Sequence, residues 1–328
     1  MTDVVGVDLG GTKIAFACFD GQQLAESTIV ATDTSSSEAL IEQLVDGVSK
    51  CRGSELDGVG IGVPSVVEFA TGRVVSSANI PLRDVPLREA LGDRLGVPVF
   101  VDNDATVAAL AEAHDDDLRM VASDLVMLTI GTGVGGGLVL GGRIYRGATG
   151  GAGELGHTMV GMDMNGAVPD AGRFPQPGSL EGETAGHAFD GLVGEYARSH
   201  PSSSLGRRQA AGEQLTGVEA VQAAQDGDAD ARRMIELWGE RVGIGIANAI
   251  NTFDPQEVVI GGGAARAGEM LLEPARRTAA AYVLPGLGSA TTIRAARHGV
   301  RAGVLGAALL AAHELAGASQ LARVQVRS

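Results

Sequence analysis

A strand, a glycine turn and a second strand occur twice in this chain, and this repeat constrains the fold more than any other feature. The first copy spans Val4–Phe19 and turns at Gly10-Gly11. The second spans Leu125–Leu140 and turns at Gly131-Thr132-Gly133. Each copy is typical of two antiparallel strands joined by a glycine turn. The repeat therefore indicates an internally duplicated protein with two α/β halves.

Hydrophobic spacing predicts further elements around the two hairpins. Three stretches rich in Gly, Pro or polar residues predict irregular connections, at 161–178, 202–217 and 286–303. The expected helices lie near Glu38–Cys51, Ala105–Ala113, Arg232–Ile250 and Val304–His313, and the expected strands are Val59–Val63, Val97–Val101 and Val258–Ile260.

Composition narrows the functional classes. A length of 328 residues favours two domains, and a net charge of −15 with 3% aromatic residues argues against a nucleic-acid-binding or membrane-surface protein. No stretch is expected to approach a membrane span, and the start of the chain does not resemble an export signal. With only Cys18 and Cys51, a disulfide framework is not expected, and we predict a reducing, cytoplasmic location.

Glycine turns are candidate phosphate sites, because backbone N–H groups can approach phosphate oxygens where no Cβ intervenes. In the first turn, Asp8 could hold Mg²⁺ through water and Thr12 could add a hydroxyl donor. The first turn could equally be an ordinary tight hairpin, whereas the repetition of the unit argues against coincidence for the second. The third glycine segment, Gly261-Gly262-Gly263, could be a plain strand-to-helix connection. Neither the Walker nor the Rossmann spacing is present, which disfavours a P-loop kinase and a dehydrogenase. The candidate nucleotide residues are Asp8, Gly10, Gly11, Thr12, Lys13, Thr132, Gly133, Gly261, Gly262 and Gly263.

The cluster Asp102-Asn103-Asp104 follows a predicted strand and precedes a predicted helix. Side chains at that position lie at the carboxyl end of a strand, where α/β proteins place ligands. One interpretation is helix N-capping, which Asp and Asn do well. Three such residues exceed the need of one cap, so one carboxylate could accept a proton from a substrate hydroxyl.

Three more polar residues are candidates on weaker grounds. Glu154 and His157 lie in a glycine-framed segment just after the second hairpin, and Glu181 follows a Gly/Pro-rich stretch. A single histidine is more often a structural hydrogen-bonding group, and a glutamate at a helix start is commonly a solvated acid.

In this order, the motifs are similar to those of the ROK family of bacterial sugar kinases, regulators and open reading frames. The resemblance covers nearly the whole chain. It rests on VGVDLGGTK, VGIGVPSVVE, SANIPLRDVPLREAL, VDNDATVAALAE, TIGTGVGGGLVLGGRIYRGATGGAGELGH and NTFDPQEVVIGGG.

The resemblance implies an α/β, actin-like ATPase fold of the hexokinase type, related to ribonuclease H, with two domains around a cleft. We expect the domains at residues 1–117 and 118–302, with a C-terminal helix at about 303–318 packing on the first. The family also implies ATP, Mg²⁺ and a homodimer.

By motif, the resemblance assigns Asp104 as the catalytic base. The phosphate-binding turns match Gly10, Gly11, Thr12, Lys13, Thr132 and Gly133. The sugar ligands match Asn103, Glu154, His157 and Glu181, and Asn79 of the SANIP segment is a further sugar contact.

The chain departs from the family in the segment that usually carries zinc-binding cysteines. Asp170, Phe174 and Ser179 replace those cysteines, so a tetrahedral thiolate site cannot form. We predict no structural zinc, with the loop held by packing. Ser65 stands where the family usually has Gly, and Leu82 where an aromatic residue often follows, both near the expected sugar pocket.

The expected function is phosphorylation of a hexose by ATP, with glucose converted to glucose 6-phosphate. Alternatives are another hexose (fructose, mannose or an N-acetylhexosamine), polyphosphate as donor, or a sugar-binding sensor without catalysis. The repressor branch of the family is disfavoured, because no helix-turn-helix extension precedes Val4.

Overall fold

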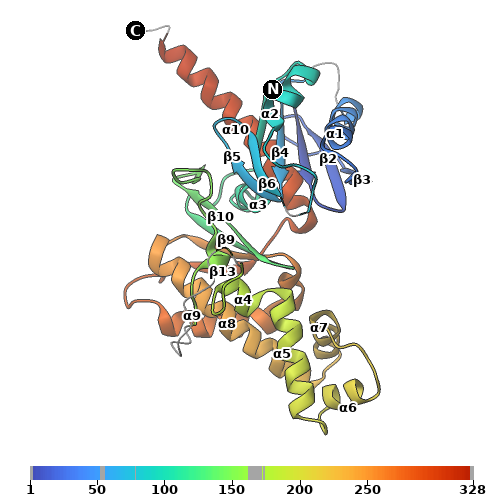
Figure 1. The fold of residues 1–328 in the computed structure, drawn as a ribbon. Helices are drawn as coiled ribbons and strands as arrows, with labels where there is room; N and C mark the ends of the chain where they lie inside the picture. The colour runs from blue at the N-terminus through green and yellow to red at the C-terminus, as the bar shows by residue number, and fades with distance from the viewer. Residues whose placement is uncertain (1–2, 52–55, 78, 162–171, 173, 326–328) are drawn as a thin grey trace. The chain divides into compact units, whose positions relative to one another are not determined.

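The computed structural model describes residues 3–325 apart from 52–55, 78, 162–171 and 173, with side chains up to residue 318. The chain divides into two compact units (Figure 1). Unit 1 comprises Met1–Asp124, Gly137–Gly153 and His298–Ser328, and unit 2 comprises Leu125–Gly136 and Glu154–Arg297. The domains expected from the sequence were 1–117, with the C-terminal helix packed on it, and 118–302; here the C-terminal helix and the segment Gly137–Gly153 both group with unit 1.

Unit 1 is built on a five-stranded sheet of order β3-β2-β1-β4-β8. The hairpin β1–β2 is antiparallel, and β4 pairs in parallel with both β1 and β8. The segment between β4 and β8 forms a separate, small antiparallel sheet of order β5-β6-β7. The strands are β1 Val4–Leu9, β2 Lys13–Phe19, β3 Thr28–Ala31, β4 Gly58–Val63, β5 Ser65–Glu68, β6 Arg73–Ser77, β7 Val85–Pro86 and β8 Val99–Asn103.

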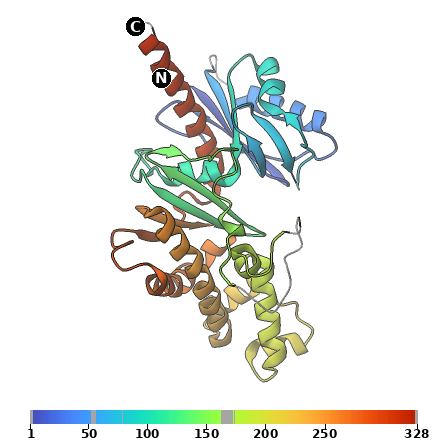
Figure 2. The same ribbon diagram turned by 60° about the vertical axis from the view of Figure 1, so that its left-hand side comes forward.

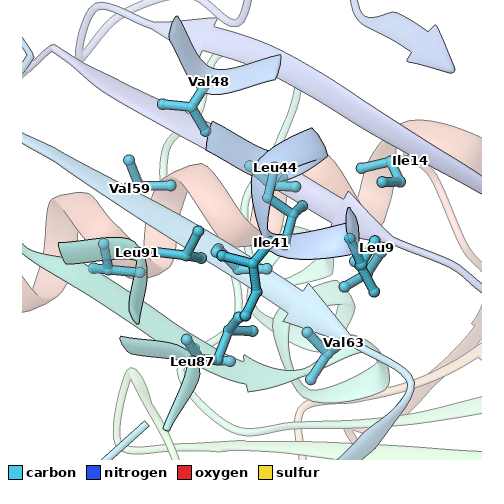
Figure 3. Close-up of a cluster of buried hydrophobic side chains, with 14 of the residues drawn as sticks. Leu9, Ile14, Ile41, Leu44, Val48, Val59, Val63, Leu87 and Leu91 are labelled. Carbon is cyan, nitrogen blue, oxygen red and sulfur yellow. The ribbon is translucent and has the colours of Figure 1, made fainter. Parts of the chain in front are cut away.

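One face of this sheet carries the aliphatic core of unit 1. Helix α1 (Ser37–Cys51) turns a stripe of Leu and Val side chains toward it, and α2 (Leu87–Leu95) packs beside α1. Spacing of three or four residues places such a stripe on one side of a helix. Figure 3 shows the cluster. Its labelled members are Leu9, Ile14, Ile41, Leu44, Val48, Val59, Val63, Leu87 and Leu91.

The other face is lined with glycine. Side chains alternate across a strand, so Gly6 and Gly60 lie opposite the aliphatic face. A Cβ on Gly6 would lie 2.2 Å from the Val304 carbonyl oxygen, and one on Gly60 would lie 1.8 Å from that of Ala307. Helices α10 (Ala302–Gln325) and α3 (Asp104–Glu112) therefore pack directly against the backbone on this side.

Helix α10 differs from one sequence expectation. The stretch Gly299–Ala318, which includes the short 3₁₀ turn η3 (Gly299–Arg301), is long and apolar enough to cross a membrane by length and composition. Half of that stretch is buried inside the protein, where α10 packs against strands β1 and β4. Figure 1 shows α10 behind β4. Burial of this kind is what the core helix of a globular unit shows.

Unit 2 combines a parallel strand pairing with a layer of helices. The sheet order is β11-β10-β9-β12-β13, and β12 is parallel to β9 and β13. Helices α8 and α9 lie side by side in both views (Figures 1 and 2). The elements of this sheet and its helices are β9 Leu125–Ile130, β10 Val134–Leu140, β11 Arg143–Ile144, η1 Leu155–His157, α4 Leu180–Thr184, α5 Gly186–Ser199, α6 Ser204–Ala210, α7 Gly217–Gln225, α8 Ala229–Phe253, β12 Glu257–Gly261, η2 Gly263–Ala267, α9 Glu269–Tyr282 and β13 Thr292–Ala295. Strand β10 passes from unit 2 into unit 1 at Gly137, and β11 is grouped with unit 1.

Two segments expected to be irregular contain regular structure. Helix α6 lies inside residues 202–217, where Ser203 caps it by accepting from the Gly206 amide at 2.9 Å. Strand β13 lies inside residues 286–303 and pairs Ile293 with Val258 of β12. Helix α6 is polar and β13 is a short edge strand, so neither gives a clear hydrophobic period.

Candidate active site

The first phosphate turn joins β1 to β2 in unit 1. The Gly10 amide donates to the Lys13 carbonyl at 3.0 Å, which closes the turn and leaves Thr12 and Lys13 exposed. A Cβ on Gly11 would lie 2.9 Å from the Cβ of Asn79. The absence of a side chain at Gly11 thus lets Asn79, a predicted sugar contact, lie against the turn.

Asp8 is the second-last residue of β1, beside that turn, and its carboxyl group lies close to Gly303 at the start of α10. Burial raises the pKa of its carboxyl group, and the charge of Lys13 partly offsets this. A Cβ on Gly303 would lie 2.5 Å from Asp8 Cγ, so glycine is needed for α10 to begin here. Asp8, Gly10, Thr12, Lys13 and Arg301 line one cavity of about 590 Å³.

The three polar residues at the end of β8 have different environments and different contacts. Asn103 is the N-cap of α3, because its Oδ1 accepts from the amides of Ala105 at 2.9 Å and Thr106 at 3.1 Å. Its Nδ2 donates only a long hydrogen bond, 3.4 Å, to the Ser65 carbonyl. Asp104 is partly exposed at the first position of α3, and its Oδ1 accepts from Ala105 at 2.8 Å.

Asp102 is the buried member of the cluster, 2% exposed, and forms a salt bridge that sequence reasoning missed. Its Oδ2 lies 2.7 Å from Arg146 Nε, while Arg146 also lies 3.3 Å from Glu314 and stacks 3.4 Å from the Phe69 ring centre. Burial raises the pKa of Asp102, and Arg146 opposes that rise. Arg146 lies inside the recognised GRIYRG motif, which is the only sequence signal for it.

The second phosphate turn joins β9 to β10 in unit 2. The Gly131 amide donates to the Gly133 carbonyl at 2.9 Å, and the Gly186 amide at the start of α5 donates to the Gly131 carbonyl at 2.7 Å. The turn opens on a cavity of about 970 Å³, whose lining includes Gly131, Thr132, His187, Trp238, Gly263 and Arg266. Arg266 and His187 supply cationic or hydrogen-bonding groups that were not predicted.

The third glycine segment follows β12. Gly263 lines the large cavity, whereas Gly261 is the buried end of the strand. Gly262 has φ +73°, and a Cβ there would lie 2.4 Å from the Ile130 carbonyl oxygen. The conformation and the close approach to β9 both require glycine at 262.

The predicted sugar ligands of unit 2 do not form one cluster of direct contacts. Glu154 and His157 are neighbours, with 3.7 Å between Glu154 Oε2 and His157 Nε2. Glu181 lies instead at the second phosphate turn, where its Oε2 accepts from the Val134 amide at 2.7 Å. Unit 1 holds the other predicted ligands, Asn79 and Asn103.

The loop that lacks cysteines has polar and aromatic contacts in their place. Ser179 is fully buried, donates to the Gln176 carbonyl at 2.7 Å and caps α4 by accepting from Gly182 at 3.1 Å. The ring of Phe174 meets that of His157 edge-on, with centroids 5.2 Å apart. Asp170 lies outside the described residues.

Two other departures noted in the sequence have different surroundings. Leu82 is completely buried in the aliphatic core of unit 1, so it is a packing residue. Ser65 is 7% exposed, and its hydroxyl has no hydrogen-bond partner within the described part of the chain. Its carbonyl accepts from Asn103 Nδ2.

Comparison with known proteins decides the family. The model of the ROK family matches residues 4–314. The chain belongs to the ROK family. This ROK protein is 35% identical over 316 residues to a glucokinase of Halalkalibacterium halodurans, covering 92% of each chain. It is 34% identical over 322 residues to an N-acetyl-D-glucosamine kinase of Shigella boydii, covering 93% of this chain and 98% of the relative.

A solved structure agrees with these relatives. A ROK family glucokinase from Streptomyces griseus, in complex with glucose and AMPPNP, has a TM-score of 0.75 and 30% identity to this ROK protein. The match covers 95% of this chain and 99% of that one. The predicted α/β fold of the actin-like ATPase type is therefore confirmed.

Proposed function

We propose that this ROK protein transfers the γ-phosphoryl group of ATP to a hydroxyl group of a hexose, with glucose as the preferred acceptor. The observation that carries the proposal is Asp104 at the carboxyl end of β8, partly exposed beside Asn103. Asn103 is the N-cap residue, so the cap does not require an acid at 104, although Asp104 Oδ1 also accepts from the Ala105 amide. Relatives of nearly full length, a glucokinase and an N-acetyl-D-glucosamine kinase, support a sugar kinase.

In this proposal Asp104 orients the attacking hydroxyl and takes its proton as the bond to phosphorus forms. Asn103 supports the sugar through Nδ2, because its Oδ1 is already used by the α3 backbone. Glu154 and His157 offer a carboxylate and an imidazole that are both solvent-accessible. Asn79 and Glu181 complete the proposed set of sugar contacts.

The two glycine turns would bind the phosphates of the nucleotide through their backbone amides. Lys13 and Arg301, which line the unit 1 cavity, add positive charge at the first turn. Gly261, Gly262 and Gly263 would bound the nucleotide pocket beside the second. Asp8 fits a hydrated Mg²⁺, because a carboxylate is a ligand that this ion prefers and Asp8 lies in the same cavity. When bound, Mg²⁺ would neutralise charge on the phosphates.

The variant Asp104→Asn tests the assigned base. We expect turnover to fall about 10³-fold with little change in glucose affinity, because the amide keeps the shape and cannot take the proton. The measurement is ADP release with Mg-ATP, separated into kcat and KM. Asp93→Asn, at an exposed position of α2, is the matched control and should leave both constants unchanged. Near wild-type turnover in Asp104→Asn would contradict the assignment.

Acceptor and donor are tested on the wild-type protein. We expect ADP release with glucose to exceed that with fructose, mannose, N-acetylglucosamine and N-acetylmannosamine. A larger kcat/KM on N-acetylglucosamine would favour the alternative that the Shigella boydii relative suggests. Sugar binding without turnover on any of the five would favour the sensor. Polyphosphate in place of ATP is the donor control. The homodimer and the cytoplasmic location stay predictions.

A further inference from the structure

The carboxylate of Glu181 forms a hydrogen bond to the backbone at the end of the second phosphate turn. Glu181 lies in the first turn of α4, and its Oε2 accepts from the Val134 amide at 2.7 Å. Val134 is the first residue of β10, directly after the turn Gly131–Gly133. The side chain therefore fixes the point at which the turn enters its second strand.

The Glu181 carboxylate also lies close to the glycine at the end of the turn. A Cβ on Gly133 would lie 2.7 Å from Glu181 Oε2, so the carboxylate would have to move away from its present position. The opposite flank is tied as well, because the Gly186 amide donates to the Gly131 carbonyl at 2.7 Å. Residues of α4 and α5 thus anchor both ends of the turn.

We propose that Glu181 is a positioning residue for the nucleotide, in addition to any contact that it makes with the sugar. By accepting from Val134, it holds the Gly131–Gly133 turn in the shape that receives the phosphates of a nucleoside triphosphate. The inference rests on the proposed function in one respect, the nucleotide as ligand of this turn. Its consequence is that loss of Glu181 weakens nucleotide binding when no sugar is present.

Two physical effects of Glu181 act in opposite directions. The carboxylate is an acceptor for the Val134 amide, and hydrogen bonds to charged groups are among the stronger ones. The same negative charge repels bound phosphates. The 2.7 Å hydrogen bond is direct, whereas repulsion is weakened by the turn amides and by solvent, so anchoring dominates. Glutamine keeps an acceptor oxygen without the charge, and alanine keeps neither.

The experiment measures binding of Mg-AMPPNP by calorimetry without sugar, so that neither turnover nor sugar affinity enters. Glu181→Ala should bind about tenfold more weakly than wild type, and Glu181→Gln should stay within about threefold. The matched control is Glu183→Gln, two residues along α4, where the native carboxylate pairs with Arg241 at 3.3 Å. This control should bind like wild type.

A double-mutant cycle with Gly133→Ala adds a test that does not depend on one variant. In the wild-type background the new Cβ displaces the Glu181 carboxylate, and binding should weaken about tenfold. In the Glu181→Ala background the Cβ has space, so the further loss should be about twofold or less. Additive losses would overturn the proposal.

The remaining outcomes separate the two proposals. Unchanged or tighter AMPPNP binding in Glu181→Ala, with weaker glucose binding, would overturn the positioning role and leave Glu181 as a sugar ligand. No AMPPNP binding by the wild-type protein would instead overturn the proposed function, and the inference with it. If Glu181→Ala does not fold, Gly133→Ala should still bind AMPPNP about tenfold more weakly than wild type, while Glu181→Gln stays within about threefold. Wild-type affinity in Gly133→Ala would then overturn the positioning role.

Discussion

At the scale of single residues, His114 is a buried histidine whose contacts determine which ring nitrogen carries the proton. Its Nδ1 lies 2.8 Å from the Leu110 carbonyl, which can only accept, so Nδ1 carries the proton. Its own carbonyl accepts from His298 Nε2 at 2.9 Å, and the His313 ring lies 5.5 Å from its ring. Burial lowers the pKa of His114, and burial together with the His114 charge lowers that of His313.

These lowered pKa values predict a loss of stability in weak acid. Because the unfolded chain binds protons more readily than the folded one, stability is complete above the ordinary histidine pKa of about 6.5 and declines as pH falls below it. Urea unfolding at several pH values should show this decline. His114→Gln should make it shallower by up to about 1.4 kcal/mol per pH unit.

The control is His200→Gln, at the exposed end of α5, which should leave the slope of stability against pH unchanged. An unchanged slope in His114→Gln would show that other groups control the acid response. The slope is the diagnostic quantity, because loss of the Leu110 hydrogen bond lowers stability at every pH.

For single residues, the sequence identifies the functional positions more readily than it predicts the role of each one. It marked Asp102, Asn103 and Asp104 as one cluster, yet the division into buried ion pair, cap and partly exposed acid depends on side-chain direction. It missed Arg146, because partners 44 and 168 positions away are brought together only by the fold.

The glycine-lined face of the unit 1 sheet is the main feature at the scale of elements. It allows α10 to approach β1 and β4 at backbone distance, with alanines and backbone carbonyls in contact with the strands. Close packing of this kind does not tolerate an added methyl group, since neither the strand nor the helix backbone can move alone.

Gly60→Ala should therefore lower the free energy of unfolding by about 3 kcal/mol or more. The reason is that its Cβ would lie 1.8 Å from the Ala307 carbonyl oxygen. Gly191→Ala is the matched control, because no atom lies within 4 Å of a Cβ there and the position is inside α5. It should raise stability by up to about 1 kcal/mol. Denaturant titration of both variants measures the contrast, and equal effects would refute the packing argument.

Elements with a strong hydrophobic period were predictable, and short or polar ones were not. The two hairpins, α1 and α8 follow from apolar spacing in the sequence. Strand β13 is defined by its pairing with β12, and Pro274 interrupts the helical pattern of α9. These two elements depend on tertiary contacts that a local pattern does not record.

For the whole molecule, the absence of the zinc-binding cysteines leads to a prediction about metal content. Within the described residues, no three His, Cys, Asp or Glu side chains gather closely enough to hold a metal ion. The Ser179 hydroxyl and the Phe174 ring make local contacts at two of the positions where the family has cysteine. Purified protein should contain no stoichiometric zinc, and EDTA should leave its Tm unchanged. Zinc at one per chain, or a Tm that falls on chelation, would contradict this prediction.

The order of synthesis has a consequence for a unit that takes its last helix from the end of the chain. The ribosome makes the strands of unit 1 first, then all of Glu154–Arg297, and only then α10. At about 5–20 residues per second, the glycine-lined face of the sheet waits on the order of ten seconds for its cover. Unit 2 can therefore complete its folding before unit 1, and in that interval the glycine-lined face of the nascent sheet stays open to other chains.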